Sequence, residues 1–302
     1  MSRNDNLPND ACPNNPQNPD YSVRFYCVRH GESEANLKGF IAGQSDVPLT
    51  ERGIDEAKRL GSRSPWISGT PFLRVYSSDL SRARDTALIA LREGKRQQDL
   101  VPLLVQDRRL RERSYGHRQG FPRSMGDEEI LQIWKERNEQ PPVYETDEDL
   151  WVRGKAWIVD VLTQIKNIHH LDHSEDVNNK EETRSEEKNT INGAESNPPK
   201  IYHVLVVAHA GMIRAMITNL IPTEILSEMG AKYDPKRNNR LIVPNTSVTI
   251  LEFSHDGAGD DDGKNEHRAV DEDPYVAQTL SSVKVVELTN AKHLESINIY
   301  DD

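Results

Sequence analysis

The residues best suited to chemistry lie in one short segment at the end of an apolar run. Residues 27–33 read Cys-Val-Arg-His-Gly-Glu-Ser, so an arginine and a histidine come where a predicted strand over 23–28 ends. Gly31 permits a sharp turn, which would let backbone N–H groups approach an anion. A histidine beside a fixed positive charge can accept a phosphoryl group, because its ring nitrogen attacks while the arginine neutralises the transferring oxygens. The same triplet would suit a buried histidine followed by a turn, so this segment alone leaves both interpretations open.

Three further segments decide between them. Residues 77–86 follow an apolar run and open a predicted helix, residues 110–116 form a turn-like stretch, and residues 204–211 end a second apolar strand with a histidine. They read Ser-Ser-Asp-Leu-Ser-Arg-Ala-Arg-Asp-Thr, Leu-Arg-Glu-Arg-Ser-Tyr-Gly and Val-Leu-Val-Val-Ala-His-Ala-Gly. In this order the four segments resemble the histidine phosphatase superfamily, also called the phosphoglycerate mutase-like family. The resemblance runs from about residue 23 to about residue 253.

The resemblance implies a two-step reaction through a phosphohistidine. His30 would be the nucleophile, and His209 would stabilise the transferring phosphoryl group. Arg29 and Arg82 would clamp its equatorial oxygens, which a planar guanidinium suits better than an ammonium group does. Glu112 would protonate the leaving oxygen and later take a proton from water. Because these arginines and histidines would neutralise the charge, we expect neither a metal nor a cofactor.

Three more residues are candidates for binding the substrate. Asn36 lies six residues after the first histidine, where the family places an amide that faces the phosphate; a turn or a helix cap is the alternative. Gly43 belongs to a segment that resembles a loop bringing backbone N–H groups to a substrate phosphate, and Ser33 completes the set. In the predicted helix after residue 80, the family spacing selects Arg82, and we expect Arg84 to be solvated.

The composition limits the partners of this protein. The 302 residues include 38 Lys and Arg against 49 Asp and Glu, a net charge of −11. This charge argues against nucleic acid or an anionic membrane as a partner, but not against a phosphorylated substrate in a local basic pocket. No apolar run approaches the roughly 20 residues of a membrane span, and the first residues lack an apolar signal core. Because Cys12 and Cys27 are not expected to pair, a reducing cytoplasm is the expected location.

The pattern along the chain predicts an α/β fold with three layers. Strands are expected at 23–28, 73–76, 201–208, 246–253 and 282–288, and helices at 50–63, 81–96, 127–137, 147–167 and 212–221. This alternation indicates a mostly parallel central sheet covered by helices on both faces, with the site beyond the carboxyl ends of the strands. Residues 1–20 are predicted to be a disordered tail. We expect residues 21–302 to form one phosphoglycerate mutase-like domain with disordered acidic insertions at about 172–200 and 254–273.

Three functions fit the resemblance. The first is a phosphatase of small phosphorylated metabolites such as fructose 2,6-bisphosphate or a bisphosphoglycerate, since segments 107–116, 207–214 and 244–247 resemble TIGAR-type fructose-2,6-bisphosphatases. The second is a cofactor-dependent phosphoglycerate mutase. Those mutases carry Gly-Leu-Asn-Lys after the tyrosine and paired arginines after Ile-Trp, but residues 120–123 read Gly-Phe-Pro-Arg and 133–136 read Ile-Trp-Lys-Glu. Losing those cations favours hydrolysis. The third is a protein phosphatase or a regulatory binding protein of the same fold.

Overall fold

A six-stranded mixed sheet forms the centre of the protein. The structure is a computed structural model that describes residues 21–94, 104–183, 199–255 and 282–294. Four neighbouring strands are parallel, and the last two continue the sheet in antiparallel pairings. In spatial order the strands are β3 (Leu104–Gln106), β2 (Phe72–Ser77), β4 (Lys200–Ala208), β1 (Tyr21–Arg29), β7 (Val248–His255) and β8 (Val283–Asn290).

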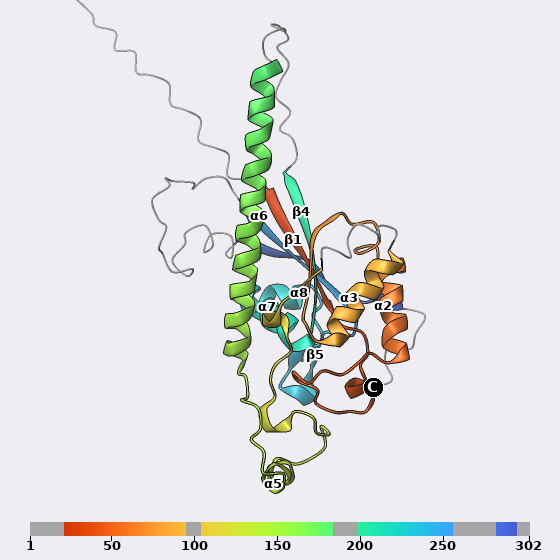
Figure 1. Ribbon diagram of the computed structural model, residues 1–302. Helices are drawn as coiled ribbons and strands as arrows, with labels where there is room; N and C mark the ends of the chain where they lie inside the picture. The colour runs from red at the N-terminus through yellow and green to blue at the C-terminus, as the bar shows by residue number, and fades with distance from the viewer. Residues whose placement is uncertain (1–20, 95–103, 184–198, 256–281, 295–302) are drawn as a thin grey trace, which may run out of the picture.

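Helices cover both faces of this sheet, so the fold has three α/β/α layers with a mostly parallel centre, as the sequence predicts. Figure 1 shows α2 (Glu51–Arg63) and α3 (Ser81–Glu93) on one face, and α6 (Asp147–Thr183) and α7 (Ala210–Leu220) on the other. The shorter elements are α1 (Glu34–Leu37), α5 (Asp127–Glu136), α8 (Thr223–Glu228), β5 (Tyr233–Asp234), β6 (Arg240–Leu241), and the 3-10 turns η2 (Arg108–Leu110), η3 (Gly116–Arg118), η4 (Pro235–Arg237) and η6 (Lys292–Leu294).

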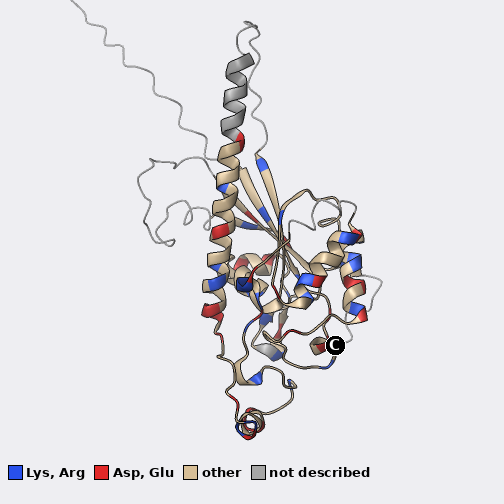
Figure 2. Ribbon diagram, in the orientation of Figure 1, with Lys and Arg blue, Asp and Glu red and all other residues tan. Residues whose placement is uncertain are grey.

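Alternating side chains of the central strands fill two separate hydrophobic cores. In β1, Phe25 and Cys27 pack into the core beneath α6 and α7, whereas Tyr26 and Val28 pack into the core beneath α2 and α3. Strand β4 divides its side chains in the same way. A parallel strand covered on both faces needs apolar residues at nearly every position, which explains the apolar runs in the sequence. Most charged residues lie on helices and loops instead, as Figure 2 shows.

The predicted strands and helices are confirmed, and two differences stand out. Strand β3, helix α8 and the β5–β6 hairpin were not predicted, because each is short and lacks a long periodic pattern. Helix α6 continues to Thr183, into the insertion expected to be disordered from residue 172. Glu and Lys support a helix well, and extending an anchored helix costs less than nucleating a new one. The predicted tail at 1–20, the rest of that insertion (184–198) and residues 256–273 of the second lie outside the described residues.

Candidate active site

The two predicted histidines come together where β1 and β4 end. The backbone N–H of His30 donates to the carbonyl oxygen of Ala208 at 3.0 Å, which ties the two strand ends to each other. The imidazole centroids of His30 and His209 lie 5.1 Å apart. Both side chains are buried. The two histidines therefore lie at the carboxyl ends of the parallel strands, where the alternation of strands and helices predicts the site.

Hydrogen bonding and burial leave His30 neutral, with one ring nitrogen free of a proton. Its Nδ1 lies 2.6 Å from the carbonyl oxygen of Gly31, which can only accept, so Nδ1 carries the proton and Nε2 keeps its lone pair. Burial, followed by the charges of Arg82 and Arg29, holds the pKa of His30 well below its usual value. The ring is therefore neutral at neutral pH, with one nitrogen available to attack an electrophile.

His209 is a buried polar group without a protein partner. It is the N-cap residue of α7, and neither ring nitrogen hydrogen-bonds to any of the described residues. Burial lowers its pKa strongly, and Arg82 and His30 lower it further. An unsatisfied buried donor costs free energy, and an anionic oxygen entering the site would satisfy it.

Two arginines face the same space. Arg29 donates from Nη1 to the carbonyl oxygen of Val243 at 2.7 Å, and Arg82 donates to those of Ser45 at 2.9 Å and Gly43 at 2.7 Å. Burial lowers the pKa of each guanidinium to about 10, so both stay charged at neutral pH. Both keep N–H groups that these bonds do not use, and those groups can hold phosphoryl oxygens.

Arg84 behaves as the sequence predicts. Its Nε donates to the neighbouring Asp85 at 2.8 Å, away from the cavity that Arg82 lines. The family spacing therefore selected the arginine that belongs to the site.

Glu112 is held at the start of α7. Its two carboxylate oxygens accept from the backbone N–H groups of Gly211 at 3.1 Å and Arg113 at 2.8 Å. A side chain at position 211 would overlap this carboxylate, so the glycine that follows the second histidine is needed for close approach. The carboxyl group lines the same cavity as His30, where it could reach a leaving oxygen.

The backbone carrying Glu112 is fixed by an arginine that the sequence did not reveal. Arg153 of α6 donates to the carbonyl oxygens of Arg109 at 2.6 Å, Arg111 at 2.7 Å and Glu112 at 3.0 Å. It also pairs with Glu145 at 3.0 Å. The segment is joined to the end of β2 by a bidentate pair between Arg111 and Asp79, at 2.7 and 2.6 Å.

Gly31 has a different role from the one predicted. Its N–H donates to the Thr86 hydroxyl at 3.0 Å, so it is not offered to an anion, and its φ is not positive. The residue must be glycine because a Cβ would overlap the backbone carbonyl of Gly53 in α2. A Cβ on Gly53 would likewise overlap the carbonyl of Glu32. Two glycines thus let α2 approach the loop that carries His30.

The three second candidates line the cavity with mixed outcomes. Ser33 and Asn36 form the capping box of α1, in which the Asn36 oxygen accepts from the Ser33 hydroxyl at 2.9 Å. Asn36 is therefore both a helix cap and a wall of the cavity, with its amide NH₂ left to donate. Gly43 adopts a φ of +53° and presents its carbonyl oxygen to Arg82. An approach of its N–H to phosphate stays a prediction.

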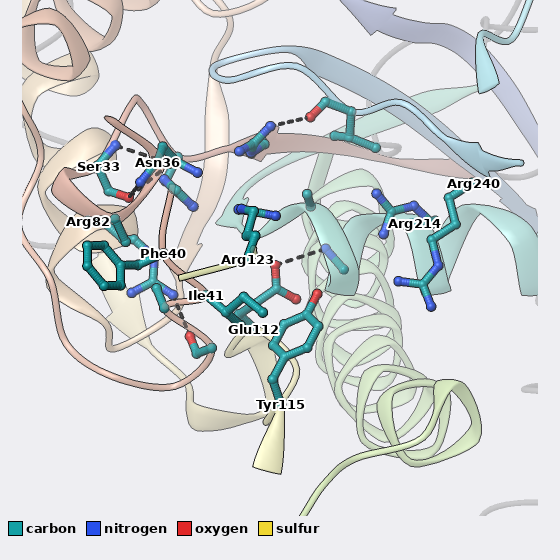
Figure 3. A pocket seen from close by; sticks show the side chains of 18 of the residues that line it. Ser33, Asn36, Phe40, Ile41, Arg82, Glu112, Tyr115, Arg123, Arg214 and Arg240 are labelled. Carbon is teal, nitrogen blue, oxygen red and sulfur yellow. Dashed lines mark hydrogen bonds between the residues drawn. The ribbon is translucent and has the colours of Figure 1, made fainter. Parts of the chain in front are cut away.

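Seven of the eight predicted site residues line one cavity of about 260 Å³: Arg29, His30, Ser33, Asn36, Gly43, Arg82 and Glu112. The eighth, His209, is fully buried and is not among the lining residues, although its ring lies 5.1 Å from that of His30. Figure 3 shows Ser33, Asn36 and Arg82 at one end, Arg214 and Arg240 at the other, and Glu112, Tyr115 and Arg123 between them. The sequence did not single out Tyr115, Arg214, Arg240 or Asp234 as lining residues. Tyr115 and Arg214 lie inside motif segments, which was a usable signal, whereas nothing in the sequence marked Arg240 or Asp234.

Arg123 corrects one argument against a mutase. The change from Gly-Leu-Asn-Lys to Gly-Phe-Pro-Arg was interpreted as the loss of a cation, but Arg123 lines the cavity and supplies one. The second change stands, because Lys135 and Glu136 are exposed and do not line it. The cation count therefore separates phosphatase from mutase less sharply than the sequence suggested.

No alternative metal or membrane chemistry emerges from the part of the chain that the structure describes. Its His, Cys, Asp and Glu side chains nowhere gather in threes suited to hold a metal ion. His169 belongs to a group of histidines at 169, 170 and 173 whose spacing could suit a metal ion. Its Nδ1 lies 3.1 Å from the Tyr202 hydroxyl. Within the same described ranges, every helix is too short or too polar to cross a membrane.

Comparison with known proteins shows which families the chain is similar to. The family model for the histidine phosphatase superfamily (branch 1) matches residues 25–169. Fructose-2,6-bisphosphatase TIGAR from Xenopus tropicalis is 37% identical over 42% of this chain and 46% of its own length. A 2,3-bisphosphoglycerate-dependent phosphoglycerate mutase from Gloeobacter violaceus is 36% identical over 47% of this chain and 66% of its own length. The chain thus spans about half to two thirds of these curated relatives.

A solved structure confirms the fold. Phosphoglycerate mutase from Bacillus anthracis superposes with a TM-score of 0.51 over 92% of this chain and 97% of that chain, at 19% identity. This likeness shows the phosphoglycerate mutase-like fold. The family match and the sequence relatives show that the chain belongs to the histidine phosphatase superfamily. Within the superfamily it is similar to the TIGAR-type fructose-2,6-bisphosphatases.

Proposed function

We propose that this protein is a phosphatase that hydrolyses small phosphorylated metabolites through a phosphohistidine on His30. One observation carries the proposal: the neutral imidazole of His30, with its proton on Nδ1, lines one cavity with Arg29 and Arg82, and the buried ring of His209 lies 5.1 Å from it. A nucleophile without charge and a cluster of fixed donors are the two requirements of metal-independent phosphoryl transfer.

The reaction has two steps. In the first, the lone pair on Nε2 of His30 attacks phosphorus, the bond from phosphorus to the leaving oxygen breaks, and Glu112 gives that oxygen its proton. In the second, Glu112 takes a proton from water, the resulting hydroxide attacks phosphorus, and the bond to Nε2 breaks to release phosphate. Arg29, Arg82 and His209 hold the equatorial oxygens in both steps.

The cavity favours a small, highly anionic substrate. Its volume of about 260 Å³ is near the lower limit of ligand pockets, and five arginines line it against two carboxylates. Fructose 2,6-bisphosphate and bisphosphoglycerates have this size and charge, and relatives named for both types of substrate match the chain. A protein phosphatase would need a mouth open to a polypeptide. A cytoplasmic location, where such metabolites occur, is part of this proposal.

A phosphoglycerate mutase is the second candidate, and Arg123 is the observation that favours it. A mutase must hold a second phosphate while the phosphohistidine waits, and Arg123 could help to hold it. The two functions differ in the fate of the phosphoryl group, which passes to water in one and returns to a glycerate in the other.

The test compares the wild type with His30→Ala and with His203→Gln as a control outside the cavity. We expect phosphate release from an aryl phosphate and from a bisphosphate to fall at least about a thousandfold in His30→Ala. Rapid quenching should trap an acid-labile, alkali-stable phosphoenzyme in the wild type only. Equal rates in wild type and His30→Ala would overturn the proposal, and net interconversion of 3- and 2-phosphoglycerate would establish the mutase instead.

A further inference from the structure

The loop before β7 holds the backbone of the proposed nucleophile. The proposed mechanism gives no role to this loop, residues 244–247, although it is one of the motif segments of the sequence. The N–H of Thr246 donates to the carbonyl oxygens of Arg29 at 3.0 Å and His30 at 3.4 Å. The side-chain amide of Asn245 also donates to the carbonyl oxygen of His30, at 3.2 Å. The loop therefore fixes the turn that carries the His30 imidazole.

Thr246 adopts a backbone conformation that is unfavourable for a β-branched residue. Its φ is +50°, in the left-handed region, where the side chain crowds the backbone. A residue in this region keeps its conformation only when the surrounding structure holds it there. The side chain of Thr246 is fully buried, so its hydroxyl group needs a partner within the protein. The partner of this hydroxyl group therefore helps to keep the N–H of Thr246 on the backbone of His30.

His293 binds the Thr246 hydroxyl from the last described turn of the chain. The Nε2 of His293 lies 3.0 Å from the hydroxyl oxygen, and both side chains are buried. Burial lowers the pKa of His293 to about 4, so its ring is neutral at neutral pH, with one nitrogen that donates and one that accepts. The turn itself, η6, packs against α2, and its Leu294 is buried. His293 is thus fixed by contacts outside the loop that it binds.

From this chain of contacts we infer that His293 is a positioning residue, which holds the backbone of His30 in place through the hydroxyl group of Thr246. The inference rests on the proposed function and adds the last described turn of the chain to the apparatus that aims the nucleophile. Neither His293 nor Thr246 lines the cavity, so the effect passes through the backbone and not through contact with substrate. Without the hydroxyl contact, we expect Thr246 to leave the left-handed region and Nε2 of His30 to lose its alignment with phosphorus.

A double-mutant cycle tests this coupling. The variants are Thr246→Val, which keeps the branched shape without the hydroxyl group, His293→Phe, which keeps a ring without nitrogen, and the two combined. We expect each single variant to lower kcat/KM for an aryl phosphate about tenfold while the inhibition constant of inorganic phosphate changes less than about twofold. The double variant should lose no more than about twofold beyond the weaker single variant, because both changes break one contact.

The control removes a second buried threonine hydroxyl group. Thr249 of β7 accepts from the backbone N–H of Thr289 in β8 at 3.1 Å, so Thr249→Val also breaks a buried contact with the C-terminal part of the chain. It should lower the unfolding free energy in urea and keep kcat/KM within about twofold of the wild type. Should His293→Phe fail to fold, Thr246→Val and Thr246→Ser still decide, because only the first loses the hydroxyl group and only the first should lose activity.

The tautomer of His30 gives a readout that does not depend on turnover. With ¹⁵N-labelled histidine, NMR should show His30 protonated on Nδ1 in the wild type and a mixture of tautomers in Thr246→Val, because the bond to the Gly31 carbonyl depends on where the backbone places the ring. Unchanged kcat/KM in folded single variants, or a hundredfold loss in the double variant, would overturn the inference. If wild type and His30→Ala hydrolyse the aryl phosphate equally fast, the proposed function fails, and the tautomer comparison still decides whether His293 positions the ring.

Discussion

At the scale of single residues, the site relies on keeping two imidazoles neutral. His30 and His209 are buried beside Arg82 and Arg29, and burial with these cations holds both pKa values far below the ordinary range. Protonation of either ring would place a further positive charge beside two guanidinium groups, which would repel it. In the proposed mechanism, His30 therefore needs no base to deprotonate it before it attacks phosphorus.

This neutrality predicts an activity that survives mild acid. For a histidine with an unshifted pKa near 6.5, the neutral fraction of the ring would be about tenfold lower at pH 5.5. Because the pKa of His30 is lowered, we expect its ring to stay largely neutral at that pH. We expect kcat/KM of the wild type to change less than about twofold between pH 7 and pH 5.5. The measurement should use an aryl phosphate with a strongly electron-withdrawing group, so that the second ionisation of the substrate lies near the bottom of the range. A tenfold fall over this interval would contradict the neutral nucleophile.

At the scale of elements, a contact between α2 and the loop after β1 positions His30. Gly31 and Gly53 each lie where a Cβ would overlap backbone of the other segment. The contact is reinforced by Glu56 of α2, whose carboxylate accepts from the N–H of Glu32 at 2.8 Å. Because no flexible side chain separates the two backbones, any added atom must displace one of them.

Gly53→Ala tests this contact. We expect it to lower the free energy of unfolding by about 2 kcal/mol or more and to reduce kcat, since relief of the overlap moves the loop that carries His30. Urea unfolding and steady-state kinetics give the two quantities. Gly126→Ala is the matched control, because its Cβ would meet nothing within 4 Å. Equal unfolding curves for the two variants would show that α2 does not constrain the loop.

The helix α6 acts on the site through Arg153, which donates to three carbonyl groups of the Glu112 segment, those of Arg109, Arg111 and Glu112. Arg153→Met would leave these acceptors without their charged donor, so we expect a loss of about 3 kcal/mol in unfolding free energy and about tenfold in kcat. Lys38→Met, which breaks an exposed pair with Glu34, should change either quantity little. A stability loss with wild-type kcat would make Arg153 a purely structural residue.

The elements were predictable to the extent that their signals are local. Alternation and helical periodicity gave β1, β4, α2, α3 and α7, and four short motifs gave the residues at the strand ends. Arg153 could not be found in this way, because it acts through hydrogen bonds to a segment 41 to 44 residues away that no local pattern encodes. Arg240 lies in a strand of two residues, which is too short to have a pattern. Gly31 shows the converse case. The sequence marks the glycine as important, but the reason for it is a tertiary contact, the close approach of the Gly53 backbone.

At the scale of the whole molecule, the charge of the chain and the charge of the site have opposite signs. The chain carries a net charge of −11, whereas the cavity is lined by Arg29, Arg82, Arg123, Arg214 and Arg240 against Glu112 and Asp234. The net negative charge of the chain repels a polyanionic substrate, and the arginines of the cavity attract it. Which field governs association depends on distance, because the screening length is about 10 Å at 0.1 M salt.

These opposing fields predict the sign of the salt dependence. We expect the arginines of the cavity to dominate because they lie nearest to the substrate, so kcat/KM for 2,3-bisphosphoglycerate should fall about fivefold or more between about 0.05 and 0.5 M salt as screening weakens the attraction. An aryl phosphate, with fewer charges, should show a shallower dependence, and Arg240→Gln should flatten the slope for the bisphosphate. A rise with salt for the wild type would mean that the acidic surface, not the arginine cavity, controls the encounter with substrate.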